Sequence, residues 1–115
     1  MPTATRDHRL DALFTALSDP TRRDIVARLS TGEATVKELA EPYAMSLQAV
    51  SQHIRVLERA GLISQGRHRQ TRPCRLEPAA LDTALSWIEQ SRRTWSDRMD
   101  RLEGHLARVQ QGEER

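Results

Sequence analysis

Apolar residues recur at helical spacing along much of this chain, and capping residues, prolines and glycines separate the segments. The first segment predicts an amphipathic helix over residues 9–17. Its apolar positions are Leu10, Leu13, Phe14 and Leu17. Asp19 can cap a second helix that starts with Pro20, where the missing N–H costs nothing, and Thr31 and Gly32 are expected to end that helix.

Two further short helices are predicted in the middle of the chain. Thr35 and Glu38 have the spacing of a capping box, so a third helix should begin there and stop near Pro42. Ser46 can cap a fourth helix that runs to Gly61. Its apolar face is expected to consist of Leu47, Val50, Ile54 and Leu57, and its polar face of Gln48, Gln52, Arg55 and Arg59, with Ser51 and His53 beside it.

After the fourth helix the pattern changes. Residues 62–66 and 72–76 flank a polar, arginine-rich stretch and predict a short two-stranded hairpin, with Pro73 confining its strand to an edge. A long helix should start near Pro78, and over residues 79–110 it would extend about 48 Å. It carries a heptad-type row: Leu81, Leu85, Ile88, Arg92, Trp95, Met99, Leu102, Leu106 and Val109.

Composition is that of one small folded domain. The chain has 115 residues, 37% of them hydrophobic and 30% charged, which is enough apolar material for a core and too little length for two independent domains. No apolar run is long enough for a signal peptide or a membrane span, so we expect a cytoplasmic protein. The net charge of +2 is small, but a local cluster of arginines would suit a polyanion: Arg67, Arg69, Arg72 and Arg75.

The helices at 35–40 and 46–60 form the informative part of the chain. The exposed face of the second one gathers residue types that read DNA, since glutamine can pair with adenine, serine and histidine can reach phosphates or base edges, and arginine such as Arg55 can hold phosphate or guanine. The free N–H groups at its start also favour a phosphate. Each residue alone has a structural interpretation: Ser51 as a surface serine, His53 packed against the third helix, and the arginines of the hairpin simply solvated.

Three segments together resemble the ArsR/SmtB family of bacterial repressors: SDPTRRDI at 18–25, VKELA at 36–40 and SLQAVSQHIRVLERAGLI at 46–63. The resemblance extends over roughly residues 9–90. It implies a mainly α-helical winged helix-turn-helix fold with a small β-hairpin wing and a long C-terminal dimerisation helix. By position it implies DNA contacts from Ser46, Gln48, Ser51, Gln52 and His53, and wing contacts from Arg67 and Arg69.

The same resemblance excludes the usual metal sites of the family. Metal-sensing members carry paired cysteines in the third helix, where this chain has Thr35, Val36 and Lys37. The alternative site needs histidines and carboxylates on the last helix and would start near Asp82, but the only histidine of that helix is His105, far from this position. We therefore expect no metal and no cofactor. Arginines beside Cys74 would lower its pKa and favour a redox role. Because no second cysteine can complete a disulfide, a bystander is the preferred interpretation.

These observations predict a non-enzymatic transcriptional regulator, most simply a homodimeric repressor of an inverted-repeat operator in double-stranded DNA that responds to an unidentified inducer. The expected organisation is a flexible N-terminus at 1–8, a DNA-binding domain at 9–77, a dimerisation helix at 78–110 and a disordered tail at 111–115. The predicted dimer interface is Leu10, Leu13, Phe14, Leu85, Ile88, Trp95, Met99, Leu102 and Leu106. The alternative is a protein-interaction module that uses the long helix on a winged scaffold, for which the base-reading face has no purpose.

Overall fold

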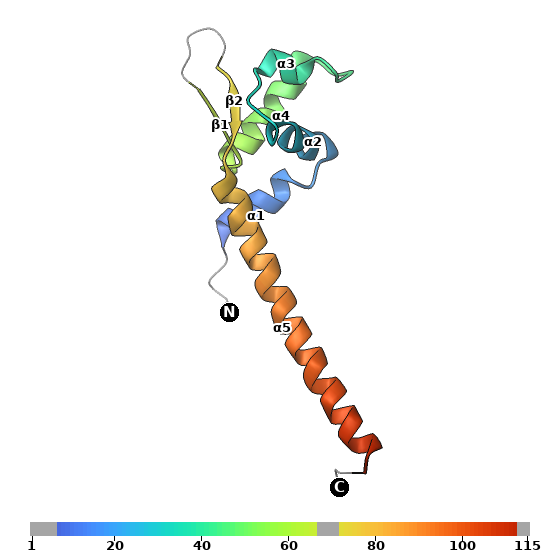
Figure 1. Ribbon diagram of the computed structural model, residues 1–115. Coiled ribbons are helices and arrows are strands. Elements are labelled where there is room, and N and C mark those ends of the chain that lie inside the picture. Colours follow the sequence, from blue (N-terminus) through green and yellow to red (C-terminus); the bar gives the residue numbers. More distant parts are fainter. Residues whose placement is uncertain (1–6, 67–71, 113–115) are drawn as a thin grey trace. The chain divides into compact units, whose positions relative to one another are not determined.

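The computed structural model describes residues 7–66 and 72–112, which form five helices and two short strands (Figure 1). The elements are α1 (His8–Ala16), α2 (Pro20–Leu29), α3 (Val36–Ala40), α4 (Leu47–Arg59), β1 (Ile63–Gln65), β2 (Cys74–Leu76) and α5 (Pro78–Gln110). The chain divides into two compact units, Met1–Ala84 and Leu85–Arg115. The mainly helical fold with a small hairpin and a long last helix confirms the predicted fold class.

Side-chain caps set the starts of the first four helices. Asp19 accepts a hydrogen bond from the N–H of Arg22 at the start of α2, and Pro20 is the first helical residue, as expected. The side chain of Thr35 and that of Glu38 satisfy each other's backbone N–H groups, which confirms the capping box of α3. Ser46 caps α4 as predicted. Helix α1 begins one residue before the expected position because Asp7 caps it.

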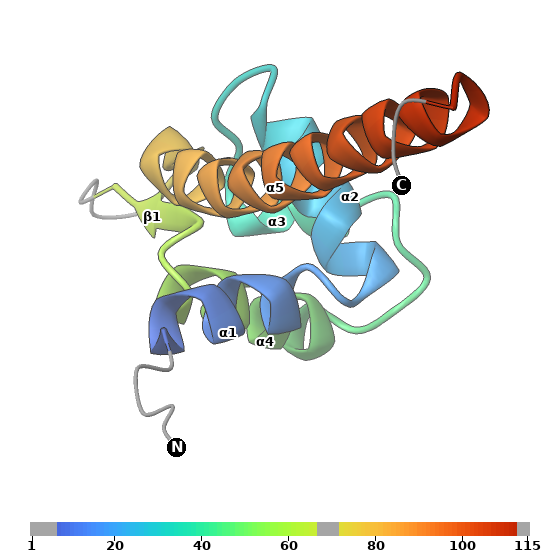
Figure 2. The same cartoon turned by 90° about the horizontal axis from the view of Figure 1, so that it is seen from below.

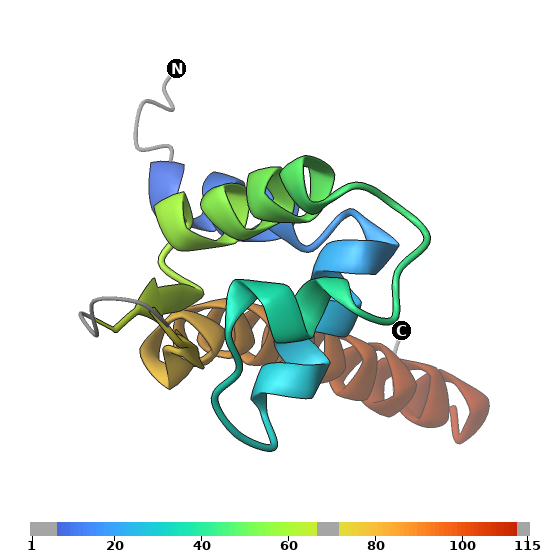
Figure 3. The same cartoon turned by 90° about the horizontal axis from the view of Figure 1, so that it is seen from above.

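The core of the first unit lies among the short helices and the hairpin. Helix α1 lies alongside α4 in the views from below and above (Figures 2 and 3), and α2 and α3 also contact α4. The buried apolar residues form one cluster: Leu13, Ala16, Ile25, Val26, Leu29, Leu39, Val50, Ile54, Leu57, Leu62, Ile63, Cys74 and Ala84. Each of the four short helices therefore contributes apolar residues to a single core.

The predicted hairpin is present as two antiparallel strands of three residues each. Its register pairs Ile63 with Leu76 and Gln65 with Cys74. Cys74 also exchanges two backbone hydrogen bonds with Ala34, which ties the hairpin to the segment before α3. Gly61 closes α4 with a φ of +81°, a conformation that glycine adopts without strain, and so allows the chain to turn into β1.

Helix α5 contributes its first two turns to the first unit, where Ala84 is buried and Ala80 and Leu81 pack against the core. Within the second unit, most of the helix surface is exposed. The exposed large apolar residues of that unit are Leu85, Trp87, Ile88, Trp95, Leu102, Leu106 and Val109. The described part of the chain contains no helix that is both long and apolar enough to cross a membrane.

Candidate nucleic-acid interface

Helix α4 has a strongly buried face and a polar exposed face. Val50, Ile54 and Leu57 are at most 1% exposed, whereas Gln48, Gln52 and Arg55 on the opposite side are exposed. Neighbours three and four residues apart share a face of a helix, so the three polar side chains form one surface. The structure thus brings together the polar residues that the sequence singled out on this helix.

The first turn of α4 differs from the expected pattern at one position. Leu47 was predicted on the buried face, but it is 55% exposed, so that assignment is wrong. As the first helical residue it lies before the buried row begins, and the cap at Ser46 fixes the turn in its place. The Ser46 hydroxyl accepts a hydrogen bond from the N–H of Ala49 at 3.1 Å, while the residue remains exposed.

Gln52 and Arg55 form a pair on the exposed surface. The Gln52 Oε1 atom accepts hydrogen bonds from Arg55 Nε at 3.2 Å and Nη2 at 2.7 Å. A guanidinium has five donors and an amide group has two, so both side chains keep donors for an outside acceptor. Ser51, one residue before this pair, is partly buried. The arrangement offers hydrogen-bond donors side by side near the middle of the helix.

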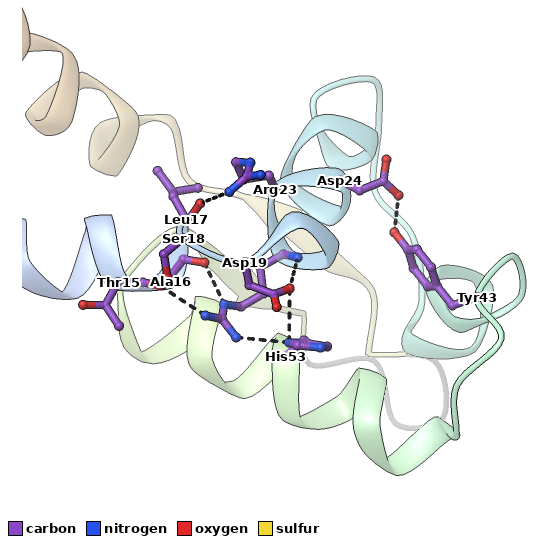
Figure 4. A network of polar contacts seen from close by, with 10 residues as sticks. Thr15, Ala16, Leu17, Ser18, Asp19, Arg23, Asp24, Tyr43 and His53 are labelled. Atoms are coloured by element: carbon purple, nitrogen blue, oxygen red, sulfur yellow. Dashed lines mark hydrogen bonds and ion pairs between the residues drawn. The ribbon is translucent and has the colours of Figure 1, made fainter.

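His53 lies at the edge of the buried face and belongs to a polar network with the start of α2 (Figure 4). Its Nδ1 atom is 3.1 Å from Arg22 Nη1 and 3.9 Å from Asp19 Oδ2, and its side chain is 22% exposed. The neighbour is therefore α2, not α3 as the structural interpretation of the sequence had it. The N–H of Arg22 holds the pKa of the Asp19 carboxyl below its ordinary value, burial opposes this, and the charges of His53 and Arg22 add to it.

A second polar cluster fixes the turn between α3 and α4. The Tyr43 hydroxyl donates to the Asp24 carboxylate, and the Arg28 guanidinium lies over the Tyr43 ring, 5.5 Å from its centre. Arg28 also donates to the carbonyls of Glu38 and Leu39 at the end of α3. Burial, and then the hydrogen bond to Asp24, raise the pKa of Tyr43. These contacts hold the turn against α2 and so set the direction in which α4 starts.

The base of the hairpin carries further charges. Ser64 donates a hydrogen bond to Glu77, and Arg75 lies 3.8 Å from the same carboxylate with its side chain mostly exposed. Arg72 is also exposed. The two arginines expected to contact DNA from the wing, Arg67 and Arg69, lie outside the described residues.

Comparison with known proteins agrees with this geometry. A family described as "Helix-turn-helix domain" matches residues 17–65. The transcriptional repressor SdpR of Bacillus subtilis is 33% identical over 79 residues, which cover 69% of this chain and 88% of SdpR. The crystal structure of an ArsR family transcriptional regulator, RHA00566, is 38% identical, with a TM-score of 0.73 over 76% of this chain and 97% of that one.

The chain belongs to the ArsR family. It is therefore a DNA-binding transcriptional regulator, and its family and fold are those of regulators, not of enzymes. The solution structure of the homodimeric winged helix-turn-helix DNA-binding domain Mb0332 from Mycobacterium bovis supports the fold alone, because it is only 22% identical, with a TM-score of 0.60 over 79% of this chain and 93% of that one.

In this ArsR-family chain Cys74 does not have the environment of a reactive thiol. It is fully buried, and burial, with a smaller contribution from the charge of Glu58, raises the pKa of its thiol to about 11. The expectation that neighbouring arginines would lower that pKa is wrong, because the β2 strand points Cys74 into the core while Arg75 lies exposed. A buried thiol that stays protonated is a poor nucleophile, so the bystander interpretation is preferred.

Nor do the described residues gather a metal site. Within residues 7–66 and 72–112, no group of three or more histidine, cysteine, aspartate or glutamate side chains is placed to hold an ion. The absence of a metal site remains an expectation for the ArsR-family regulator as a whole.

The residues predicted for the dimer interface fall into two groups. In α1, Leu13 is 2% exposed and packs into the core of its own unit, whereas Leu10 is half-buried and Phe14 is 38% exposed. In α5 most of the predicted positions are exposed and Met99 is half-buried. The exposed members are Leu85, Ile88, Trp95, Leu102 and Leu106.

Sequence reasoning missed the residues that orient α4. Asp19 had been assigned only as a cap, and no role had been given to Arg22, Arg28 or Tyr43. Arg22 and His53 are 31 residues apart in the chain, and Asp24 and Tyr43 are 19 apart. Helical periodicity detects only neighbours within one element, so no local signal could have found these pairs.

Proposed function

We propose that this regulator is a homodimeric repressor that binds an inverted-repeat operator with α4 in the major groove. The observation that carries the proposal is the polar face of α4. Gln48, Gln52 and Arg55 are exposed on a helix whose other face is locked into the core. An α-helix fits the major groove, where glutamine and arginine can form bidentate contacts with adenine and guanine.

The rigidity of that helix supports the assignment. The contacts of α4 to α1, α2 and α3 bury Val50, Ile54 and Leu57 almost completely. A reading helix must hold its side chains in register with the bases, and a core-anchored helix does so at less entropic cost than a mobile loop. Ser46 and the free N–H groups of the first turn are then placed for a phosphate beside the groove.

The proposed dimer rests on the apolar row of α5. Trp95 is 60% exposed and Leu102 and Leu106 about half exposed within the chain. Folded proteins seldom leave a long row of large apolar side chains in water, and a twofold axis would cover the row of one subunit with its copy. Two copies of α4 would then reach successive major grooves, which matches an inverted repeat.

Repression is proposed from the relatives. SdpR, which shares 33% identity, is named a transcriptional repressor. A dimer bound at a promoter would exclude other proteins from the same DNA, and an unidentified inducer would release it. A role as a scaffold for protein binding is not favoured, because such a scaffold has no use for the polar face of α4.

Substitution on that face tests base reading. Gln48→Ala and Gln52→Ala should each weaken operator binding by about 1–3 kcal/mol while leaving binding to unrelated DNA nearly unchanged. Gln90→Ala on α5, an exposed glutamine outside the apolar row, is the matched control and should have no effect. An equal loss on operator and unrelated DNA would contradict base contact by the glutamines.

The wing has its own test. Arg67→Ala combined with Arg69→Ala should lower affinity on every DNA sequence and reduce the salt slope by about one for each phosphate that the wing no longer neutralises. Arg93→Ala on α5 is the control for removal of one positive charge. If the double variant kept the wild-type salt slope, the wing would not contact the DNA backbone.

A further inference from the structure

His53 is the residue of α4 whose surroundings point beyond the proposed reading of bases. It lies between the buried face and the polar face of the helix, and one of its ring nitrogens is held by α2 (Figure 4). The other ring nitrogen, Nε2, points away from Asp19 in that view. The ring therefore connects the interior network to the edge of the proposed DNA-binding surface.

Arg22 is a fixed support for the ring. Its Nε donates to the carbonyl of Ala16 at 2.7 Å and its Nη2 to the carbonyl of Thr15 at 3.1 Å, so the guanidinium is anchored to the end of α1. Its Nη1 is thereby directed at Nδ1 of His53, 3.1 Å away. The planar fork of a guanidinium makes these three directions interdependent.

This contact selects the tautomer of His53. A guanidinium has donors and no acceptor, so Nδ1 of His53 must accept and cannot carry a proton. The competing partner is the Asp19 carboxylate, which would accept a proton from Nδ1, but its distance of 3.9 Å is beyond that of a hydrogen bond. In neutral His53 the proton is then on Nε2, which is a donor.

We propose that Arg22 locks His53 in the Nε2–H tautomer, so that α4 offers this nitrogen as a neutral hydrogen-bond donor to a phosphate oxygen of the DNA backbone. The inference rests on the proposed function and narrows the DNA contact expected of His53 to a phosphate, which would position the helix. The place of the ring favours a phosphate: it lies at the side of α4, while the base-reading residues Gln48 and Gln52 occupy the exposed face. The charges beside the ring do not oppose an anion, since the Arg22 guanidinium offsets the carboxylate of Asp19.

The tautomer can be measured without DNA. Nitrogen-15 NMR of the full chain at about pH 8 should show His53 Nδ1 unprotonated and Nε2 protonated. Arg22→Met should shift both resonances toward a mixture of tautomers. Arg23→Met is the matched control, because Arg23 also donates to a carbonyl, that of Leu17, and does not bond to His53. A protonated Nδ1 in the wild type would overturn the lock, whether or not the variants fold.

The phosphate contact has a distinctive signature in DNA binding. At the same pH, His53→Ala should weaken binding to operator and to unrelated DNA alike, by roughly 10- to 100-fold as expected for a bond to a charged acceptor. The salt slope should not change, because a neutral imidazole releases no counterion when it binds. A loss confined to the operator would mean a base contact and would overturn the phosphate assignment.

Two isosteric variants separate the two ring nitrogens. His53→Gln places an amide nitrogen near the position of Nε2 and should recover part of the affinity, whereas His53→Asn keeps an acceptor near Nδ1 for Arg22 and should not. If the asparagine variant bound as wild type and the glutamine variant did not, His53 would serve only as an internal brace. Wild-type binding by all three His53 variants would overturn the phosphate contact but leave the proposed function intact. Failure of the unmodified protein to select any DNA would refute that function and leave the NMR result standing.

Discussion

Helices α4 and α5 carry apolar residues at the same kind of helical spacing, but the two rows differ in their exposure to solvent. In α4, Val50, Ile54 and Leu57 are at most 1% exposed because α1, α2 and α3 cover them. In the second unit, Trp95 and Leu106 remain more than half exposed. The α4 row is thus part of the core, whereas these α5 side chains remain exposed among the described residues.

Helical periodicity alone does not say which molecule covers an apolar row. An apolar row indicates a face that must be buried, and the burial can come from the same chain or from another. The row in α4 belongs to the core of the first unit, while we propose that the row in α5 is covered by a second copy. Substitutions in the two rows should therefore have different consequences.

The largest effect is expected from a charge in the α5 row. Leu102→Glu should give monomers whose first unit stays folded, because Leu102 has no part in its core. Operator affinity should fall by a factor on the order of 10²–10⁴, the avidity of two linked half-sites. Sedimentation, circular dichroism and operator binding on this variant test each step. A folded monomer that bound the full operator as tightly as wild type would contradict the dimer mechanism.

Leu57 and Leu102 form a matched pair of leucines, one in each row. Leu57→Ala removes a fully buried side chain and should lower the free energy of unfolding of the first unit by about 2–5 kcal/mol. Leu102→Ala should leave that unit's stability unchanged and instead raise the dissociation constant of the dimer. Denaturation followed at several protein concentrations separates the two, since only the α5 variant should alter the concentration dependence. Equal effects would mean that the two rows do not differ in this way.

A smaller effect is expected at the cap of α2. Asp19→Ala should destabilise the first unit by about 0.5–2 kcal/mol near neutral pH, whereas Asp19→Asn, which also caps, should cost little. The pKa of Asp19 is lowered in the folded state, so the contribution of its charge is complete above about pH 4, the unfolded value, and is lost as pH falls through the folded value.

The stability difference between wild type and Asp19→Ala should therefore shrink in acid, as measured by denaturant unfolding at a series of pH values. A difference that stayed constant down to about pH 2, below the usual range of the carboxyl, would show that the Asp19 charge adds nothing to the cap.

No effect at all is expected from metal. An ion bound between copies of α5 would be a different way to join two subunits. A strong chelator therefore tests whether apolar contacts alone maintain the dimer. Neither chelator nor added zinc should shift the operator-binding curve or the dimer dissociation constant. A reproducible change of tenfold or more, about 1.4 kcal/mol of coupling, would show that a metal site exists.

The sequence predicted the elements well and the contacts between them poorly. Caps are local signals, so Asp19, Thr35 and Ser46 could be placed from spacing alone, and the structure confirms all three. The exposure of Leu47 could not be predicted, because its spacing to Val50 fits the buried row.

The same distinction between local signals and contacts between elements holds for the candidate site. Periodicity placed Gln48 and Gln52 on the polar face, because that property belongs to one helix. The link from Arg22 to His53 depends on how α2 packs against α4, and Cys74 is buried because the hairpin closes on the core. Such properties follow from tertiary packing, for which a single sequence carries no direct signal.

The most direct test of DNA reading by a dimer is selection of bound sequences from a random pool of double-stranded DNA. The full chain should enrich an inverted repeat whose half-sites are about 10–10.5 base pairs apart from centre to centre, or a multiple of that spacing, because two copies of α4 face one side of the duplex. Leu102→Glu in the same selection should retain at most a single half-site. Failure of the wild-type protein to enrich any sequence, or enrichment of an unpaired half-site, would contradict the account.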